Sequence, residues 1–160
     1  MIRKIIFIVF VFQLSFLKSQ SINVNNIEIV RDYFGVPHIF SKTDAELAYG
    51  LAWAHAEDDF KTIQEAYLAG NSMLSKHIGL RGAPIDFLSQ LIRPDDTIDS
   101  LYKTLDKQFV KVAHGYAEGL NSFAKNHPDQ VLVNKLFPIT PRKMLKYSLL
   151  QLFMFSEGEK

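Results

Sequence analysis

The chain has 160 residues, of which 48% are hydrophobic and 22% charged, a composition typical of one globular domain with a sizeable core. Three of its 18 basic residues and none of its 17 acidic residues lie within residues 1–20, so the remainder carries a formal charge of −2 and indicates no basic surface for nucleic acid. The absence of cysteine excludes disulfides, cysteine nucleophiles and cysteine-ligated zinc, although it does not exclude export.

Residues 1–20 indicate a signal peptide. A short basic start with Arg3 and Lys4 precedes an apolar run from Ile5 to Leu17. This run is too short to cross about 30 Å of hydrocarbon comfortably, and it suits the apolar region of a signal peptide. The segment ends without a clean small-x-small cleavage motif, so an uncleaved inner-membrane anchor stays the alternative. We expect a periplasmic or secreted protein.

Residues 27–41 are predicted to form a β-hairpin. Ile27, Ile29 and Arg31 alternate with Glu28, Val30 and Asp32, as on the two faces of a strand. Gly35 supplies the turn, and Pro37 begins the second strand, where a missing N–H is tolerated. His38 is a candidate ligand or base. Because no Asp or Ser partner is evident near it, we interpret it as a hydrogen-bonded structural histidine.

A buried helix is predicted from Thr43 to Gly70, with a possible extension to His77. Thr43 and Glu46 have the spacing of a capping box. Residues 47–56 are apolar on nearly every side, as in a helix that is buried rather than at the surface. Glycines 70 and 79 are plausible ends or breaks.

Three consecutive acids, Glu57, Asp58 and Asp59, interrupt this helix. If they are buried, they need cations, N–H donors or a metal as partners. The alternative is that the helix turns its second half toward solvent, since buried acids are rare.

Two helices are predicted in the middle of the chain. Pro84 suits the first position of a helix over Ile85 to Ile92, and residues 93–96 read as a connection. A long helix is predicted from Asp99 to residue 126, because the residue before Pro128 is pushed out of helical geometry. Its apolar stripe has spacings of three, four and seven residues and comprises Leu101, Leu105, Phe109, Val112, Tyr116, Leu120 and Phe123.

The same long helix contains Gly115 and Gly119, four residues apart. Each costs about 1 kcal/mol relative to alanine in a helix interior, so we expect a neighbouring element to pack closely against them. Three lysines, at 103, 107 and 111, lie off the stripe and indicate a solvated face.

A last helix is predicted from Arg142 to about Ser156, with Thr140 as its N-cap and Pro141 at its first position. Its expected buried residues are Leu145, Leu149, Leu152 and Phe153. The sequence then stops at Lys160 with no closing strand or cap, so we expect it to be incomplete.

The residues do not compose a self-sufficient active site. There is no histidine pair with metal-ligand spacing, no glycine-rich phosphate loop and no G-x-S-x-G nucleophile turn. Cleavage after Gln20 would expose Ser21, and a serine whose own α-amine acts as base is a known nucleophile type. However, nothing around Ser21 would build an oxyanion hole, so a disordered mature N-terminus is favoured. No catalytic residue is assigned.

Four blocks occur in order along the chain: IEIVRDYFGVPHIFSKT from Ile27, YGLAWAHAEDDF from Tyr49, HGYAEGLNSF from His114 and FPITPRKM from Phe137. Together they resemble the amino-terminal (α-chain) part of the penicillin acylase family of N-terminal-nucleophile amidohydrolases, which includes penicillin, cephalosporin and acyl-homoserine-lactone acylases. Two positions depart from the family pattern: Asp59 stands where many members carry Arg, and Asn71 lies in a stretch where Arg or Gly-Glu is common, which puts the usual ion pairing of that helix in question.

The resemblance implies an α+β, predominantly helical fragment, the α-chain part of a four-layer αββα hydrolase, with residues 21–160 as a partial domain. It implies a precursor that cuts itself into α and β chains, with the nucleophilic Ser as the first residue of the β chain. That residue lies downstream of Lys160, so the fragment is expected to be inactive alone and to need the β chain as partner. The expected reaction is hydrolysis of the acyl–amide bond of penicillin-like or N-acyl-homoserine-lactone-like substrates.

The resemblance also suggests site residues near the end of the chain. By position, Met154 and Phe155 would line the acyl pocket; plain core packing is the alternative. Glu157 would be a calcium ligand, as the relatives imply, or else part of a solvated helix end, since Ca²⁺ takes 6–8 oxygens and none are supplied nearby. No organic cofactor is expected. The alternative function is an exported, non-catalytic helical binding module with the same scaffold.

Overall fold

The computed structural model describes residues 22–157, so the predicted signal peptide and Ser21 lie outside the described residues. The described part is mainly helical and contains one two-stranded sheet, as the sequence predicts. The principal elements are β1 (Glu28–Arg31), β2 (Pro37–Phe40), α2 (Asp44–Gly70), α3 (Ser75–Ile78), α4 (Ala83–Leu91), α5 (Pro94–Leu101), α6 (Lys107–Asn126) and α7 (Pro141–Glu157). Short 3₁₀ turns cover Val24–Asn26, Gly79–Gly82, Tyr102–Thr104, Pro128–Gln130 and Asn134–Leu136.

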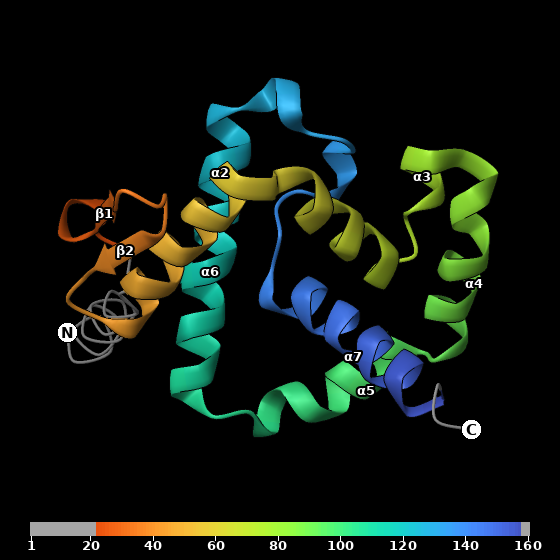
Figure 1. Ribbon diagram of the computed structural model, residues 1–160. Helices are drawn as coiled ribbons and strands as arrows, with labels where there is room; N and C mark the ends of the chain where they lie inside the picture. The colour runs from red at the N-terminus through yellow and green to blue at the C-terminus, as the bar shows by residue number, and fades with distance from the viewer. Residues whose placement is uncertain (1–21, 158–160) are drawn as a thin grey trace, which may run out of the picture.

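The first half of α2 crosses α6 on the side of the molecule that carries the hairpin (Figure 1). The hairpin lies beside the first half of α2 at one end, and α3 and α4 lie at the other end. Helix α7 lies below the second half of α2, with α5 beside it.

The hairpin forms as predicted. Its strands are antiparallel with Ile29 opposite Ile39, and Gly35 takes the positive φ of +83° that the turn needs. The Asp32 carboxylate accepts hydrogen bonds from Phe34 N at 2.9 Å and Val36 N at 3.0 Å. The turn is thereby held by a side chain as well as by the ladder.

Helix α2 begins at the predicted cap but is not straight. The Thr43 hydroxyl accepts from Glu46 N at 3.3 Å, and the helix ends at Gly70 rather than His77. Asp59 interrupts it with φ −157° and ψ 71°, and its carboxylate accepts from Thr62 N at 3.0 Å. Asp59 thus acts as an N-cap for the second half, which produces the bend in α2 visible in Figure 1.

The contact between α2 and α6 depends on glycine, as predicted. A Cβ added to Gly115 would lie under 3.0 Å from the carbonyl oxygen of Ala45, and one added to Gly119 would lie as close to the carbonyl oxygen of Tyr49. Both obstacles are backbone atoms of α2. The two helices therefore approach more closely than any side chain at these positions would allow.

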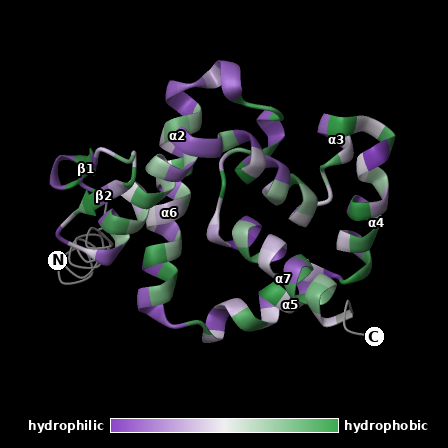
Figure 2. Ribbon diagram, in the orientation of Figure 1, coloured by the Kyte–Doolittle hydropathy of each residue, from purple (hydrophilic) through white to green (hydrophobic). Residues whose placement is uncertain are grey.

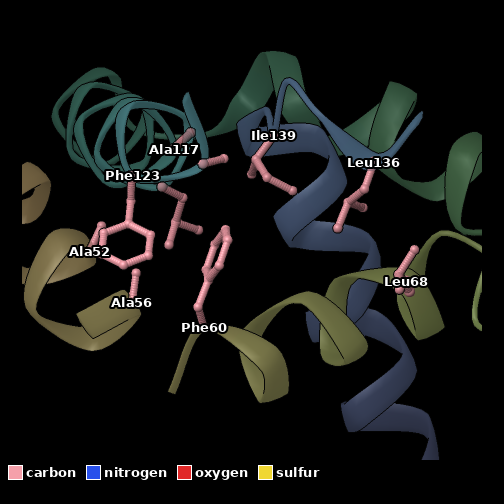
Figure 3. Close-up of a cluster of buried hydrophobic side chains, with 10 residues drawn as sticks. Ala52, Ala56, Phe60, Leu68, Ala117, Phe123, Leu136 and Ile139 are labelled. Atoms are coloured by element: carbon pink, nitrogen blue, oxygen red, sulfur yellow. The ribbon is translucent and has the colours of Figure 1, made fainter. Parts of the chain in front are cut away.

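The main hydrophobic cluster joins α2, α6 and the connection to α7 (Figure 3). Phe60 of α2 and Phe123 of α6 meet edge to face with ring centroids 5.0 Å apart, a favourable geometry for aromatic pairs. The other labelled members come from both helices and from the connection to α7: Ala52, Ala56, Leu68, Ala117, Leu136 and Ile139.

The prediction of one helix from Asp99 to residue 126 is wrong. The chain is extended at Leu105, with φ −64° and ψ 144°, and Asp106 then caps α6 by accepting from Gln108 N at 2.8 Å and Phe109 N at 3.1 Å. The predicted connection at 93–96 is also wrong, because α5 already begins at Pro94 and the link between α4 and α5 consists of Ile92 and the left-handed residue Arg93.

Helix α7 has the predicted start, since the Thr140 hydroxyl accepts from Lys143 N at 3.3 Å. Its predicted buried face is wrong: Leu145 and Leu149 are only partly buried, and Leu152 is 65% and Phe153 36% exposed. The buried leucine of this helix is Leu150. The reason is the position of the contact: Gly70 of α2 lies against the backbone of Tyr147, so α7 packs through its first turns and then runs past α2.

Candidate functional site

The distal end of α7, defined as residues 152–155, is an apolar surface that the described residues leave uncovered. Its side chains are Leu152, Phe153, Met154 and Phe155, which are 65%, 36%, 49% and 74% exposed. Four consecutive helical residues point to all sides of the axis, and a helix segment that is apolar all round is normally buried. Core packing within the described residues does not account for Met154 or Phe155.

The calcium prediction at Glu157 lies at the limit of the described structure. Glu157 is the last residue of α7, and its side chain lies outside what is described. Within residues 22–157, no three histidine, aspartate or glutamate side chains gather as a metal site requires. Ca²⁺ needs 6–8 oxygens, so these residues do not form a calcium site by themselves.

Two side-chain amides fix the connection that leads into α7. Gln64 of α2, only 1% exposed, donates from Nε2 to the carbonyl of Gln130 at 3.0 Å, and its Oε1 accepts from Leu132 N at 2.9 Å. Asn121 of α6 donates to the carbonyl of Ile139 at 2.9 Å and accepts from the Ile139 N–H at 2.6 Å. Each amide satisfies backbone groups that would otherwise be costly to bury.

A third amide holds the first turn of α7. Asn71, just past the end of α2, donates from Nδ2 to the carbonyl of Lys143 at 3.0 Å and to that of Tyr67 at 2.8 Å. The Lys143 ammonium donates to the carbonyl oxygens of Leu136 and Pro138 at 2.5 and 2.9 Å. Partial burial, with a contribution from nearby Lys146, lowers the pKa of Lys143.

Helix α5 supports the other side of α7. Arg142 forms an ion pair with Asp99, and its guanidinium lies over the Tyr102 ring, 4.5 Å from the centroid. One turn on, Lys146 pairs with Asp95 at 2.5 Å. The apolar distal end of α7 is therefore carried on a helix whose first turns are held from both α2 and α5.

The three carboxylates in the middle of α2 have the partners expected of such groups but are exposed. Arg31 Nη2 lies 3.1 Å from Glu57 and 2.8 Å from Asp58, and Trp53 Nε1 donates to Glu57 at 3.0 Å. The two carboxylates hydrogen-bonded to Arg31 raise the pKa of its guanidinium. The interpretation that the helix turns these acids toward solvent is correct. Glu57 and Asp58 tie the hairpin to α2, whereas Asp59 caps the second half of the helix.

His38 is hydrogen-bonded, as expected, but the expectation that no Asp lies near it is wrong, because Asp32 is its partner. Its Nε2 lies 3.3 Å from Asp32 Oδ2, across the hairpin turn. The hydrogen bond from His38 is the main cause that holds the pKa of the Asp32 carboxyl below its ordinary value, with help from the N–H groups of Val36 and Phe34. The pair is exposed and stabilises the turn.

A cavity of about 390 Å³ lies between the ends of α2 and α4 and the start of α5. Its charged side chains are already paired, Arg93 with Asp96 and Lys146 with Asp95, both at 2.5 Å. The cavity therefore offers no uncompensated charge to a ligand.

No helix of residues 22–157 combines the length and apolar character that crossing a bilayer requires.

Comparisons with known proteins agree on one family. The penicillin amidase profile matches residues 26–157. Penicillin G acylase of Escherichia coli is 23% identical over 135 residues, which cover 81% of this chain and 16% of that protein. Acyl-homoserine lactone acylase PvdQ of Pseudomonas fluorescens (strain Pf-5) is 28% identical over 103 residues, 59% of this chain and 13% of that protein.

A solved structure shows the same fold. The thermostable penicillin G acylase from Alcaligenes faecalis superposes with a TM-score of 0.67 at 20% sequence identity, covering 78% of this chain and 71% of that chain. The prediction of a predominantly helical fragment of the acylase fold is thereby confirmed. The chain spans about a sixth or less of the length of the curated relatives it matches.

Proposed function

Because the chain belongs to the penicillin amidase family, we propose that it is the α-chain part of an exported acylase, which hydrolyses the amide bond between an acyl group and an amine. Penicillin-like or N-acyl-homoserine-lactone-like amides are the proposed substrates, in keeping with the names of the relatives it matches. This chain supplies the helical shell, one strand pair and part of the acyl pocket of a four-layer αββα enzyme, and another part of the enzyme carries out the chemical step.

The proposed nucleophile is a serine at the start of a β chain that follows residue 160 in the precursor. Within the described residues, no serine hydroxyl is hydrogen-bonded to a histidine: those of Ser75 and Ser89, for example, donate to Asp86 and to the carbonyl of Gly70. A hydroxyl nucleophile needs such a base or its own α-amine. Much longer relatives support a site encoded elsewhere in the gene.

The relative lengths also support a separate α chain. The likeness covers 71% of the solved Alcaligenes acylase chain, whereas it covers only 16% of the curated E. coli acylase. The solved chain is thus close in length to this one and much shorter than a complete acylase. A β chain from the same precursor is accordingly the proposed partner.

The observation that carries the pocket assignment is the uncovered distal end of α7. Ligand pockets are lined mainly by apolar and aromatic side chains mounted on rigid elements. Met154 and Phe155 meet both conditions, since they are apolar side chains on a helix whose first turns are held by the Asn71 amide and two ion pairs, and they are exposed. We assign them to the wall of the acyl pocket, closed on its other side by the β chain.

Glu157 is proposed as one calcium ligand only. Glu157 would bring a single carboxylate to the site. The remaining oxygen ligands would come from outside residues 22–157, because within these residues no group of three candidate ligands gathers.

Export is proposed from residues 1–20, and N-terminal sequencing of the mature protein tests it: a start near Ser21 indicates a cleaved signal, whereas a start at Met1 indicates an anchor.

The test of the pocket uses the enzyme produced from the complete gene and two amide substrates, one with a short aryl-acetyl group and one with a long alkanoyl group. Phe155→Ala is expected to change the ratio of their kcat/KM values by about tenfold, the usual effect of a modest change in an apolar pocket. Phe87→Ala, which removes a 68%-exposed phenylalanine on α4, serves as control and should leave the ratio unchanged. An unchanged ratio of kcat/KM values in both variants would show that Phe155 does not line the acyl pocket.

If the product of the complete gene hydrolyses no amide, the alternative function, a non-catalytic binding module, is favoured.

A further inference from the structure

The polarity of α4 is reversed relative to an ordinary surface helix. Its buried residues are Asp86 and Ser89, whereas Phe87 and Leu91 are 68% and 62% exposed. A surface helix normally turns its apolar residues toward the core and its polar residues toward water. Figures 1 and 2 show α4 at the end of the molecule opposite the hairpin, with hydrophobic residues along its ribbon. Exposed apolar side chains that gather on one element mark a contact surface.

The exposed apolar residues lie on one side of this helix. The 3₁₀ turn Gly79–Gly82 runs directly into α4, so the two form one continuous helical segment. We call its exposed apolar residues the α4 stripe; at spacings of four, three and four residues, they are Leu80, Pro84, Phe87 and Leu91. Residues at such spacings share one face of a helix. Leu80, at the start of the stripe, is 89% exposed.

Hydrogen bonds on the buried side of α4 hold the stripe in place. The Asp86 carboxylate accepts from the backbone N–H groups of Leu74 and Ser75 at 2.7 and 2.9 Å. The Ser89 hydroxyl donates to the carbonyl of Gly70, at the end of α2, at 3.0 Å. The polar residues of α4 thus attach the helix to its neighbours, and its apolar residues are presented outward on a fixed support. A surface that is ordered before binding loses less conformational entropy when it is bound.

Two exposed cations stand beside the stripe. Arg81 directly follows Leu80, and Lys76 lies in α3. A Cβ added to Gly82 would lie 2.6 Å from the backbone nitrogen of Ser75, so the start of α3 packs closely against the first turn of the stripe. The apolar stripe is therefore bordered by positive charge.

This positive charge is not compensated locally. Within residues 22–157 neither Lys76 nor Arg81 forms an ion pair, whereas the neighbouring Arg93 is paired with Asp96. The only acid among residues 75–91 is Asp86, which is buried and bonded to N–H groups. The stripe and its border thus combine exposed apolar side chains with an excess of cations.

An anionic lipid surface matches this combination. Helices that lie in a membrane interface place Phe and Leu at the boundary of the acyl chains and carry Lys or Arg beside them, and each such cation adds attraction to anionic headgroups. Lysine is depleted in protein–protein interfaces, so a protein partner fits less well. A twofold pairing of two copies of this chain through the stripe would bring Lys76 and Arg81 toward the same cations of the other copy, and like charges repel.

We propose that the α4 stripe, together with Lys76 and Arg81, binds the surface of a membrane that contains anionic phospholipid. Phe87 and Leu91 enter the boundary between the headgroups and the acyl chains, and the two cations pair with lipid phosphate groups. The contact is peripheral and leaves the helix parallel to the membrane plane. The inference concerns where the protein resides and does not depend on the proposed reaction.

The experiment uses the mature enzyme produced from the complete gene, without residues 1–20, so that the predicted signal peptide cannot anchor it. The enzyme is sedimented with vesicles of phosphatidylcholine alone or with about one-third phosphatidylglycerol. We expect at least tenfold stronger binding to the vesicles with phosphatidylglycerol, and binding that weakens as the salt concentration rises. No binding to these vesicles, or equal binding to both kinds, would overturn the inference.

Two variants with matched controls locate the contact. Phe87→Ser should weaken binding to the anionic vesicles about tenfold, because a large apolar side chain no longer leaves water. Phe109→Ser, which changes an exposed phenylalanine on α6, should leave binding unchanged. Lys76→Glu combined with Arg81→Glu should also weaken binding at least tenfold, whereas Lys103→Glu combined with Lys107→Glu should not. Undiminished binding in either variant of the stripe or its border contradicts the proposal.

The same Phe87→Ser enzyme distinguishes the other occupants of the stripe. In solution without lipid, it should keep the second chain and the oligomeric state of the parent enzyme, measured by analytical ultracentrifugation. Loss of the second chain would show that the polypeptide after residue 160 covers the stripe, and loss of a dimer would show that a second copy does. Either result overturns the membrane inference. Failure of vesicle binding with amide hydrolysis intact leaves the proposed function standing.

Discussion

Replacing Gly119 of α6 with alanine is expected to destabilise the protein, although helix propensity alone predicts the reverse. In a helix interior the change from glycine to alanine stabilises by about 1 kcal/mol. At this position the new Cβ would lie 2.8 Å from Ala52 Cβ and closer still to the carbonyl oxygen of Tyr49. The backbone of α2 cannot rotate away as a side chain can, so the helices must separate.

The magnitude follows from these opposing effects. Overpacking a core typically costs about 1–3 kcal/mol, and the upper part of that range applies where the obstacle is backbone. After subtraction of the propensity gain, we expect a net loss of about 1–2 kcal/mol in the free energy of unfolding. Separation of α2 and α6 would also loosen the contact of Phe60 with Phe123 shown in Figure 3.

The assay is urea unfolding followed by circular dichroism, with linear extrapolation of the free energy. Glu118→Ala changes the neighbouring, exposed residue of α6 and is expected to stay within about 0.5 kcal/mol of the parent protein. If Gly119→Ala raised the unfolding free energy while Glu118→Ala left it unchanged, the close approach of α2 and α6 would be refuted.

Three further perturbations test how α7 and the start of α2 are held. Gln64→Leu leaves buried backbone groups of the connection unpaired and should lower the unfolding free energy by about 1–3 kcal/mol, measured by thermal and urea unfolding; no loss would show that water replaces the amide. Asn121→Ala should speed hydrogen exchange at the Ile139 amide by at least tenfold, and an unchanged rate would mean that the amide is protected in another way. The hydrogen bond from Asn26 is the main cause that holds the pKa of the Glu46 carboxyl below its ordinary value of 4.5. This carboxyl therefore stabilises the fold above that pH and loses the effect as the pH falls through its lowered pKa. Glu46→Gln should make the urea midpoint less dependent on pH on the acid side, and an identical dependence would contradict the assignment.

Sequence patterns predicted the elements whose signals are local. The caps at Thr43 and Thr140, the turn at Gly35 and the close packing at Gly115 and Gly119 all occur where the residues indicated. Each depends on a requirement that one or two residue types satisfy: a hydroxyl acceptor, a positive φ or the lack of a side chain. Such requirements can be read without knowing the rest of the fold.

Helix ends set by competing signals were predicted poorly. The apolar spacing through Leu105 suggested a continuous helix, but the Asp106 carboxylate accepts hydrogen bonds from Gln108 N and Phe109 N, and this cap sets the start of α6. Asp59 likewise breaks α2 by capping Thr62 N, and apolar periodicity contains no information about such a choice. The same pattern misplaced the buried face of α7, because exposure of Leu152 depends on where α2 ends.

The candidate site was predictable only through the family resemblance. Nothing in the residue pattern distinguishes Met154 and Phe155 from core residues, since both kinds are apolar at helical spacing. The supporting amides were missed for the opposite reason: Gln64 and Asn121 resemble surface residues until the connection folds onto them. A buried amide that bonds to distant backbone groups has no local sequence signal.

The central claim is that the catalytic group lies on polypeptide other than these 160 residues, and one measurement tests it most directly. The product of the complete gene is purified, its hydrolysis of an acyl amide is assayed, and the masses and N-termini of its polypeptides are determined. We predict activity only when two chains are present, with this chain as the shorter one and a serine at the N-terminus of the longer one. Hydrolysis by residues 1–160 alone, or by a single uncut polypeptide, would contradict the account.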